Sequence, residues 1–321
     1  MKPSTIHEAD VEAMALDCLE ALNYATLRGG EVMPGEPQAE RLNYAEAFLP
    51  DRLRASLRKL NPRIPAAALA EAFRKVTLAP HPSLISNNRG FHRMFVDGLA
   101  VESRRQDGSI GTEILRVIDF EDVENNDWLA VSQFTMIEGP YHRRADVVIF
   151  LNGLSLGVIE LKNAVDENAD IWQAFQQLQT YKQQVPALFL HNAVPVISDG
   201  LEARIGTISA DRERFMPWRT ITRETLAPAK LPQLEVLLRG VFDKRWFLDL
   251  IRLFVVFEDD GHTVTKKMAG YHQFHAVNIA IAETLRAAGA VKSGMLKDKA
   301  TGYYAKKQPG GESGDQRAGV V

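Results

Sequence analysis

Cysteine, long apolar runs and any strong excess of charge are nearly absent from this 321-residue chain. The single cysteine, Cys18, excludes a disulfide framework and suits the reducing conditions of a cytoplasm. No apolar run approaches the roughly 20 residues that a membrane-spanning helix needs, and the acidic, amphipathic N-terminus is unlike a signal peptide. We therefore expect a cytoplasmic protein with no membrane partner. Since the formal net charge is -3, any DNA contact must come from a local patch.

Short motifs that assign a cofactor are also missing. No G-x-x-x-x-G-K-[ST] phosphate-binding loop occurs anywhere in the chain. The eight histidines include no H-E-x-x-H pair and no Cys/His spacing typical of zinc sites. ATP hydrolysis by this stretch of chain and a zinc site are therefore not expected.

The spacing of apolar residues predicts an α/β fold, in which a sheet is flanked by helices. Helices are expected over 5–22, 43–60 and 65–76, and the segments 25–38 and 79–90 are expected to be loops. From about residue 95 the period becomes that of strands. Strands are expected near 96–103, 114–120, 128–137, 146–151 and 154–162.

The second half of the chain continues this alternation. A helix is expected from Asp166 onward, with acidic residues at its start as the helix dipole favours. Two further strands are expected within 188–200 and 203–210. Three prolines between 216 and 235 indicate a boundary, after which apolar helices are expected over 234–257 and 268–288.

The stretch RADVVIFLNGLSLGVIELKNA, residues 143–163, is predicted to be a hairpin of apolar strands with charged residues at its edges. The side-chain period of two places Glu160 and Lys162 on one face of the second strand. A two-residue turn at Asn152-Gly153 would set Asp146 opposite Ile159, on the other face from Glu160.

A three-residue loop with a bulge, or a bulge further along the hairpin, would instead set Asp146 opposite Glu160. We predict one of these two arrangements. Adjacent carboxylates cannot both ionise cheaply without a cation, and an all-oxygen site with open positions suits Mg²⁺. Lys162 could orient or deprotonate an attacking water, or stabilise a phosphate. The alternative is a solvated hairpin rim held by a loose salt bridge.

Together, these residues resemble a known family. Asp146, Glu160-x-Lys162 and Gln177-x-x-x-Tyr181 on the following helix resemble the motifs of PD-(D/E)xK nucleases. The arrangement is similar to the N-terminal part of the restriction (R, HsdR) subunit of type I restriction-modification enzymes. The resemblance extends along nearly the whole chain, through HEADVEAMALDCLEALNY, FHRMFVDGLAVE and AGYHQFHAVNIAIAETLRA. One departure is Ala145, where the family usually has a proline.

The resemblance implies roles for these residues. Asp146 and Glu160 would be the metal ligands, Lys162 the catalytic base or phosphate stabiliser, and Gln177 and Tyr181 accessory residues of the site. An acid on the opening helix often completes such sites. Glu8 or Glu12 would fill this position, although both are also ordinary exposed residues of a helix face. Basic residues beside the first acid, His142, Arg143 and Arg144, are candidates for contact with DNA phosphate.

The resemblance also implies a domain order. Residues 1–233 would form a PD-(D/E)xK endonuclease domain with a helical insertion at about 36–90. Residues 234–260 would be a helical linker, and 261–321 the truncated start of a RecA-like translocase domain. Gln273 would contact adenine as part of a Q motif, with an amphipathic helix of no such role as the alternative. The final RAGVV resembles the strand that leads into a phosphate-binding loop, so we expect an N-terminal fragment of a longer subunit.

Two functions follow as expectations. The first is a Mg²⁺-dependent endonuclease domain that cleaves double-stranded DNA, coupled in the full-length subunit to ATP-driven translocation. The second is a non-catalytic docking module that binds the methyltransferase (M) and specificity (S) subunits. Loss of Mg²⁺-dependent nicking in Asp146→Ala would favour the first function, and metal-independent binding of the M–S complex alone would favour the second.

Overall fold

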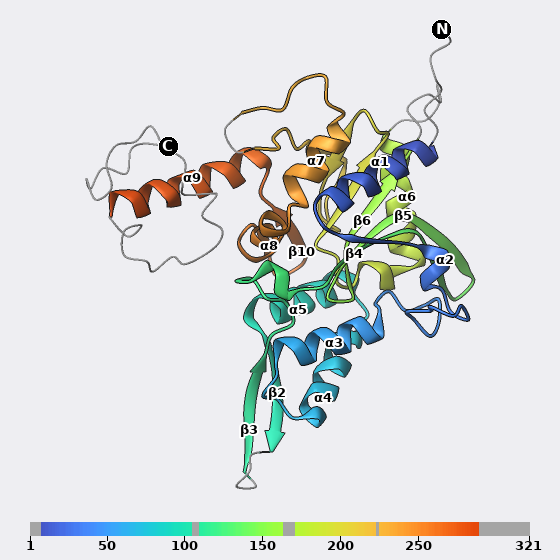
Figure 1. Cartoon of the computed structure of the whole chain (residues 1–321), viewed down its shortest axis with the longest axis vertical. Coiled ribbons are helices and arrows are strands. Elements are labelled where there is room, and N and C mark those ends of the chain that lie inside the picture. The colour runs from blue at the N-terminus through green and yellow to red at the C-terminus, as the bar shows by residue number, and fades with distance from the viewer. Residues whose placement is uncertain (1–7, 105–108, 163–170, 223–224, 289–321) are drawn as a thin grey trace. The chain divides into compact units, whose positions relative to one another are not determined.

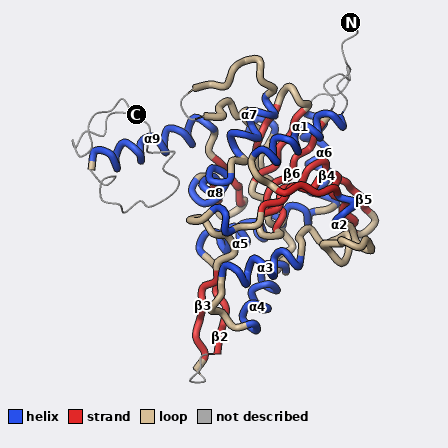
Figure 2. The backbone as a smooth tube through the Cα atoms, viewed as in Figure 1, coloured by secondary structure: helices blue, strands red, loops and turns tan. Residues whose placement is uncertain are grey.

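The computed structural model describes residues 8–104, 109–162, 171–222 and 225–288. The chain divides into two compact units, Met1–Met268 and Ala269–Val321. The first unit combines a sheet with helices (Figures 1 and 2), so the predicted α/β class is confirmed. Among the described residues, none of the helices combines the length and the hydropathy required to cross a bilayer.

The α-helices, in chain order, are α1 (Glu8–Ala21), α2 (Gly29–Val32), α3 (Pro50–Leu60), α4 (Ala66–Thr77), α5 (Leu84–Asp97), α6 (Ile171–Gln184), α7 (Gln233–Val241), α8 (Lys244–Leu253) and α9 (Tyr271–Ala287). The strands are β1 (Ala25–Arg28), β2 (Leu99–Arg104), β3 (Ile110–Leu115), β4 (Trp128–Glu138), β5 (Tyr141–Leu151), β6 (Leu154–Leu161), β7 (Val194–Ser198), β8 (Ala203–Ile205), β9 (Val255–Asp259) and β10 (Val264–Met268). Of these elements, α9 alone belongs to the second unit.

A six-stranded sheet with the order β1-β4-β5-β6-β7-β8 forms the centre of the first unit. Strands β4, β5 and β6 follow one another as an antiparallel meander. In contrast, β1 pairs parallel to β4, and β7 pairs parallel to β6. The sheet is therefore mixed. Two further ladders, β2 with β3 and β9 with β10, are separate antiparallel ribbons.

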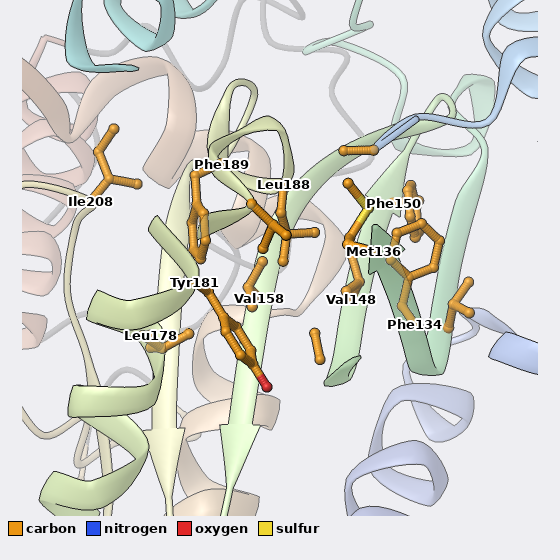
Figure 3. Packing of buried hydrophobic residues seen from close by; sticks show 14 of the residues in the cluster. Phe134, Met136, Val148, Phe150, Val158, Leu178, Tyr181, Leu188, Phe189 and Ile208 are labelled. Atoms are coloured by element: carbon orange, nitrogen blue, oxygen red, sulfur yellow. The ribbon is translucent and has the colours of Figure 1, made fainter. Parts of the chain in front are cut away.

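Helices cover both faces of this sheet, because the side chains of its strands alternate between two apolar layers. Val148 of β5 and Val158 of β6 belong to the cluster that includes Tyr181 of α6 (Figure 3). The intervening Gly157 faces the other way, and a Cβ there would lie 3.3 Å from Phe242 at the end of α7. Thus α6 covers one face, while α7 and the α1 helix packed on it cover the other.

Two segments that were expected to be loops contain regular structure. Within 25–38, β1 gains its hydrogen bonds from β4, a partner about 100 residues away that local propensity does not reveal. Within 79–90, α5 begins at Leu84, where the Ser83 hydroxyl accepts the amide of Ser86 at 3.4 Å. The buried Asn88 donates to carbonyls across the fold, of Phe189, Leu190 and Asn192. These tertiary bonds offset the poor helix propensity that led to the wrong prediction.

Several element boundaries also differ from the prediction, among them the start of β5, which is Tyr141 and not residue 146. The helix expected over 43–60 begins only at Pro50, because the preceding Leu49 amide is bonded to the Gly153 carbonyl at 2.7 Å. The strand expected near 114–120 occupies Ile110–Leu115 instead. The stretch 234–257 is not one helix. The Asp243 carboxylate caps a new helix, α8, and the chain then turns into β9.

A buried lysine joins the β9–β10 ribbon to the rest of the first unit. Lys266 of β10 is 2% exposed, and its ammonium donates to Asn88 Oδ1 at 3.0 Å and to the Asn192 carbonyl at 2.6 Å. Burial lowers the pKa of Lys266 to about 7. The folded state therefore disfavours the charged form of this side chain.

This burial predicts a pH dependence of stability. Between pH 7 and 10 the unfolded chain holds a proton on Lys266 that the folded chain has lost, so the free energy of unfolding should rise with pH. We expect this proton to contribute a rise of about 4 kcal/mol in the wild type and a clearly smaller rise in Lys266→Met, where Lys182, whose pKa burial lowers to about 8, still contributes in this way. Urea denaturation at several pH values measures both. Lys267→Met, which changes the neighbouring half-buried lysine that pairs with Glu258, is the control and should keep the rise. The same rise in Lys266→Met would contradict the assignment.

Candidate active site

The β5–β6 hairpin has a two-residue turn and a bulge. Asn152 and Gly153 have positive φ angles of 54° and 81°, the conformation that a tight Asn-Gly turn requires. Leu151 pairs with Leu154 across this turn. The predicted three-residue loop is therefore wrong.

The bulge lies three residues further along the second strand. Phe150 pairs with Ser155 but Ile149 pairs with Gly157, so Leu156 is an extra residue of β6. The shifted register then pairs Val147 with Ile159, which sets Asp146 opposite Glu160 at the next position. The alternative prediction, a bulge that brings the two acids together, is confirmed.

The Asp146 and Glu160 carboxylates lie at the point where β5 and β6 separate. Both are buried, with 7% and 0% exposure. Asp146 Oδ2 accepts the backbone amide of Leu161 at 2.7 Å. The Lys162 ammonium lies 3.2 Å from Glu160 Oε1 and donates to the Leu161 carbonyl at 2.8 Å. The hairpin alone thus gathers two carboxylates and one ammonium.

Burial makes this carboxylate pair unusually basic. Burial raises the pKa of Asp146 to about 6, although the Leu161 amide and the Lys162 charge act in the opposite direction. Burial also raises the pKa of Glu160 well above its usual range, and the Asp146 charge raises it further. Each ionised carboxylate therefore disfavours ionisation of the other, which a cation between them would relieve.

Helix α6 places two polar side chains beside these acids. Gln177 Nε2 donates to Tyr181 Oη at 2.6 Å, one helical turn away. Tyr181 Oη in turn donates to the Arg144 carbonyl of β5 at 2.8 Å. Burial raises the pKa of Tyr181, and the Glu160 charge raises it further. The predicted pair therefore lies at the site and contacts the strand that carries Asp146.

A cavity of about 510 Å³ opens at this end of the sheet. Its lining comes from α1, β4, β5 and α6, and consists of Glu8, Thr135, His142, Arg143, Arg144, Asp146, Gln177, Thr180 and Tyr181. All three basic residues singled out from the sequence thus share a cavity with Asp146. Arg143 Nε donates to Gln184 Oε1 of α6 at 2.6 Å, whereas Arg144 is exposed.

The two glutamates of the opening helix differ in position. Glu8 lines the cavity, and its carboxylate lies 4.0 Å from the Lys162 ammonium. Glu12, one turn later, accepts a hydrogen bond from the side chain of Gln133 on β4. Glu8 is therefore the acid of α1 that faces the site directly.

Gln273 lies in the second unit, at the start of α9. Its side-chain oxygen accepts the Gly270 amide at 3.0 Å, which caps the first turn of the helix. Contact of Gln273 with adenine stays a prediction. The final RAGVV, 317–321, lies outside the described residues.

The donor set fits a hard divalent cation. Glu160 Oε2 is buried and has no hydrogen-bond partner among the described residues, which is costly unless a cation or a proton supplies one. No three His, Cys, Asp or Glu side chains within the described ranges are arranged to hold a metal. A cation here would therefore have Asp146 and Glu160 as its protein carboxylates and would keep water or substrate oxygens, as Mg²⁺ commonly does.

One residue next to the site escaped prediction from the sequence. Gln133 lies in β4 opposite Asp146 and has a positive φ of 54°, which is uncommon for a residue other than glycine. No local signal marks it, because VSQFT has the composition of an ordinary strand. The polar partner Glu12 lies 121 residues away in the sequence.

The protein therefore has a mixed sheet covered by helices. Two buried carboxylates and a lysine lie where two strands of this sheet separate. The family model for the N terminus of type I restriction enzyme R proteins matches residues 5–214. The chain belongs to this family.

Individual relatives agree with this assignment. The type I restriction enzyme HindI endonuclease subunit of Haemophilus influenzae is 36% identical over 286 residues, 87% of this chain and 27% of the relative. The putative type I restriction enzyme MjaIXP endonuclease subunit of Methanocaldococcus jannaschii is 27% identical over 295 residues, 86% of this chain and 27% of the relative. A Staphylococcus aureus relative, the type I restriction enzyme SauCOLORF180P endonuclease subunit, is 39% identical over 75 residues, 23% of this chain and 8% of the relative. The chain spans about a quarter of the length of the first two relatives.

Because two buried carboxylates lie side by side, we predict that the site destabilises the fold when no metal is bound. Because the pKa of Glu160 is raised on folding, the free energy of unfolding should fall as pH rises above about 4. Glu160→Gln should reduce this fall, to which Asp146 also contributes, and be more stable than the wild type by roughly 1 to 3 kcal/mol at pH 8. Urea denaturation in the presence of a chelator would measure the difference, which should shrink towards pH 4.

Glu102→Gln, at an exposed position on β2, is the matched control and should match the wild type at both pH values. A Glu160→Gln variant less stable than the wild type at pH 8 would show that Glu160 stabilises the fold as an ordinary ion-pair partner of Lys162.

Proposed function

We propose that this chain is the Mg²⁺-dependent endonuclease domain of a type I restriction enzyme R subunit, with a PD-(D/E)xK core that hydrolyses phosphodiester bonds in double-stranded DNA. The observation that carries the proposal is the bulge at Leu156, which sets Asp146 opposite Glu160 with Lys162 beside them. The names of the relatives, which describe endonuclease subunits, agree with it.

In this proposal Asp146 and Glu160 hold the cation through the oxygens that now lie buried between β5 and β6. The cation would neutralise charge on the phosphate and lower the pKa of a bound water. Lys162, held by Glu160 and by the Leu161 carbonyl, would aim its ammonium at the phosphate or at the attacking water. The water oxygen bonds to phosphorus as the bond to the leaving sugar oxygen breaks, and a proton passes to that oxygen.

The residues of α6 and α1 complete the proposed site. Tyr181, through its bond to the Arg144 carbonyl, fixes the strand that carries Asp146 against α6. Gln177 holds the Tyr181 hydroxyl and lines the cavity, where it would meet the sugar-phosphate chain. Glu8, 4.0 Å from Lys162, would keep the ammonium at the cavity wall.

We further propose that the full-length subunit couples cleavage to ATP-driven DNA translocation and works with the M and S subunits. Family membership supports this wider assignment. Gln273 would then contact adenine at the entrance to a translocase region that follows α9.

Metal binding is the first test. Calorimetry with Mg²⁺ or Mn²⁺ should detect binding by the wild type and its loss in Asp146→Ala/Glu160→Ala, while Glu102→Ala at an exposed position should bind normally. The affinity should rise at least tenfold from pH 5 to pH 7, because Asp146, with its pKa of about 6, must lose its proton to bind, and so must Glu160, whose pKa is also raised. Nicking of a plasmid should follow the same pattern.

Failure of the wild type to bind metal, both alone and with a short duplex, would contradict the nuclease proposal. Metal-independent capture of the M–S complex by the same protein would then favour the docking module.

Phosphate contact by Arg144 is the second test. The Arg144 side chain is exposed in the cavity and forms no ion pair with the described residues, so it is free to meet a DNA phosphate. Arg144→Gln should weaken duplex binding about fivefold at low salt and reduce the slope of log K against log salt by about 1. Fluorescence anisotropy in a chelating buffer measures both quantities without cleavage.

Arg204→Gln, on β8, is the matched control, since Arg204 pairs with Glu202 outside the cavity. Arg143→Gln should have a smaller effect than Arg144→Gln, because Gln184 already engages its guanidinium. Equal losses in all three variants would mean that the attraction is general and not a contact by Arg144.

A further inference from the structure

An irregularity in β4 lies directly across from Asp146. The β4–β5 ladder pairs Ser132 with Val147 and resumes with Phe134 and Ala145, and between these pairs Gln133 has a φ of 54°. A residue other than glycine in this left-handed conformation is strained by about 1 kcal/mol or more. Such strain persists only where the surrounding structure imposes it.

The alternation of side chains along β4 changes at this residue. Leu129 and Val131, before Gln133, belong to the core cluster under α6, and so do Phe134 and Met136 after it. Regular alternation from Leu129 would place residues 133 and 135 in that cluster instead. The strand therefore makes a local twist at Gln133.

Strand β5 makes the matching change at Asp146. Val148 and Phe150 belong to the core cluster, and so does Ala145, which regular alternation would turn to the other face. The ladder of β5 with β6 ends at Val147 and Ile159, whereas the ladder of β5 with β4 continues to Tyr141. The twist thus coincides with the fork in the sheet.

Two parts of the chain hold Gln133 in this conformation. On its side chain, Nε2 donates to the Glu12 carboxylate of α1. On its backbone, Gly29 at the start of α2 packs so closely that a Cβ there would lie 2.1 Å from the Gln133 carbonyl oxygen. Only glycine at position 29 permits this contact. Gln133 is therefore held by α1 through its side chain and by α2 through its backbone.

Because β5 and β6 separate at the fork, a backbone N–H of β6 can donate to the Asp146 side chain. Beyond the last pair of the ladder, Val147 with Ile159, the Leu161 amide donates at 2.7 Å to Asp146 Oδ2. That bond sets the place of the carboxylate relative to Glu160. A change in the twist at Gln133 would move β5 and break this bond.

We propose that Gln133 is a positioning residue, held by Glu12 and Gly29, that sets the Asp146 carboxylate at the fork between β5 and β6. Its consequence for catalysis rests on the proposed nuclease function, but its effect on the Asp146–Leu161 bond does not. This assignment also gives the two acids of α1 separate tasks. Glu8 faces the cavity, and Glu12 acts through Gln133.

The test uses variants that remove the contact between the Gln133 and Glu12 side chains without adding backbone strain. Gln133→Gly keeps the positive φ at no steric cost and deletes only the side chain. Glu12→Ala deletes the partner, while Glu12→Gln retains an oxygen that can accept the same hydrogen bond. Asn23→Gly is the matched control, because Asn23 is another non-glycine residue with positive φ (63°), at the exposed end of α1.

Two measurements separate positioning from general stability. The first is amide hydrogen exchange of Leu161 in metal-free buffer, with the Val158 amide of β6 as the internal reference. The second is Mn²⁺ affinity by calorimetry. In Gln133→Gly and Glu12→Ala we expect Leu161 to exchange roughly tenfold faster while Val158 is unchanged, and Mn²⁺ to bind roughly tenfold more weakly. Glu12→Gln and Asn23→Gly should stay within about twofold of the wild type in both measurements.

Wild-type exchange of Leu161 in Gln133→Gly and Glu12→Ala would overturn the proposal, whatever the metal does. Equal acceleration at Leu161 and Val158 would overturn it as well, since that pattern reports general loosening of β6. Faster exchange at Leu161 alone, in a protein whose wild type binds no Mn²⁺, would uphold the positioning role and contradict the proposed metal-dependent function.

Discussion

A single extra residue in β6 is the constraint on which the site depends. Without the bulge at Leu156, Asp146 would pair with Ile159, and its carboxylate and that of Glu160 would lie on opposite faces of the sheet. With it, the two acids are neighbours in a buried fork, and burial raises the pKa of both. The fold thus keeps two carboxylates that repel each other when both are ionised. The Lys162 ammonium offsets only part of this repulsion. Arrangements of this kind cost stability and are typical of sites that bind or react.

The elements around the fork come from distant parts of the chain. Helix α1 places Glu8 at the cavity and Glu12 on Gln133, α6 places Gln177 and Tyr181 beside β5, and β4 supplies the irregular position opposite Asp146. These contacts surround the fork with polar partners, and Tyr181 is at the same time a member of the apolar cluster under α6. The core sets the positions of the strands, while the polar contacts around the fork set the positions of the reactive groups.

Much of this site could be predicted from the sequence, because the signals are local. The apolar walls of residues 143–163, the Asn-Gly turn and the period of two predict the hairpin, and the requirement that the acids share a face predicts the bulge. Gln177 and Tyr181 are one helical turn apart within a recognisable helix. In contrast, elements whose stabilising partners lie far away in the sequence could not be predicted. Strand β1 depends on β4, α5 depends on carbonyls from 189–192, and the β9–β10 ribbon depends on buried bonds to Lys266.

The sequence by itself therefore determined the α/β class, the hairpin and the identity of the paired acids with their lysine, since periodicity and turn chemistry act over a few residues. The tertiary structure alone decided which form of register shift occurs, which glutamate of α1 faces the cavity, and that Gln133 adopts a strained conformation opposite Asp146. The physical reason is that these features arise where separate segments compete for the same hydrogen-bond donors and space. Only the folded sheet brings Gly29, Glu12 and Leu161 into contact with Gln133 and Asp146.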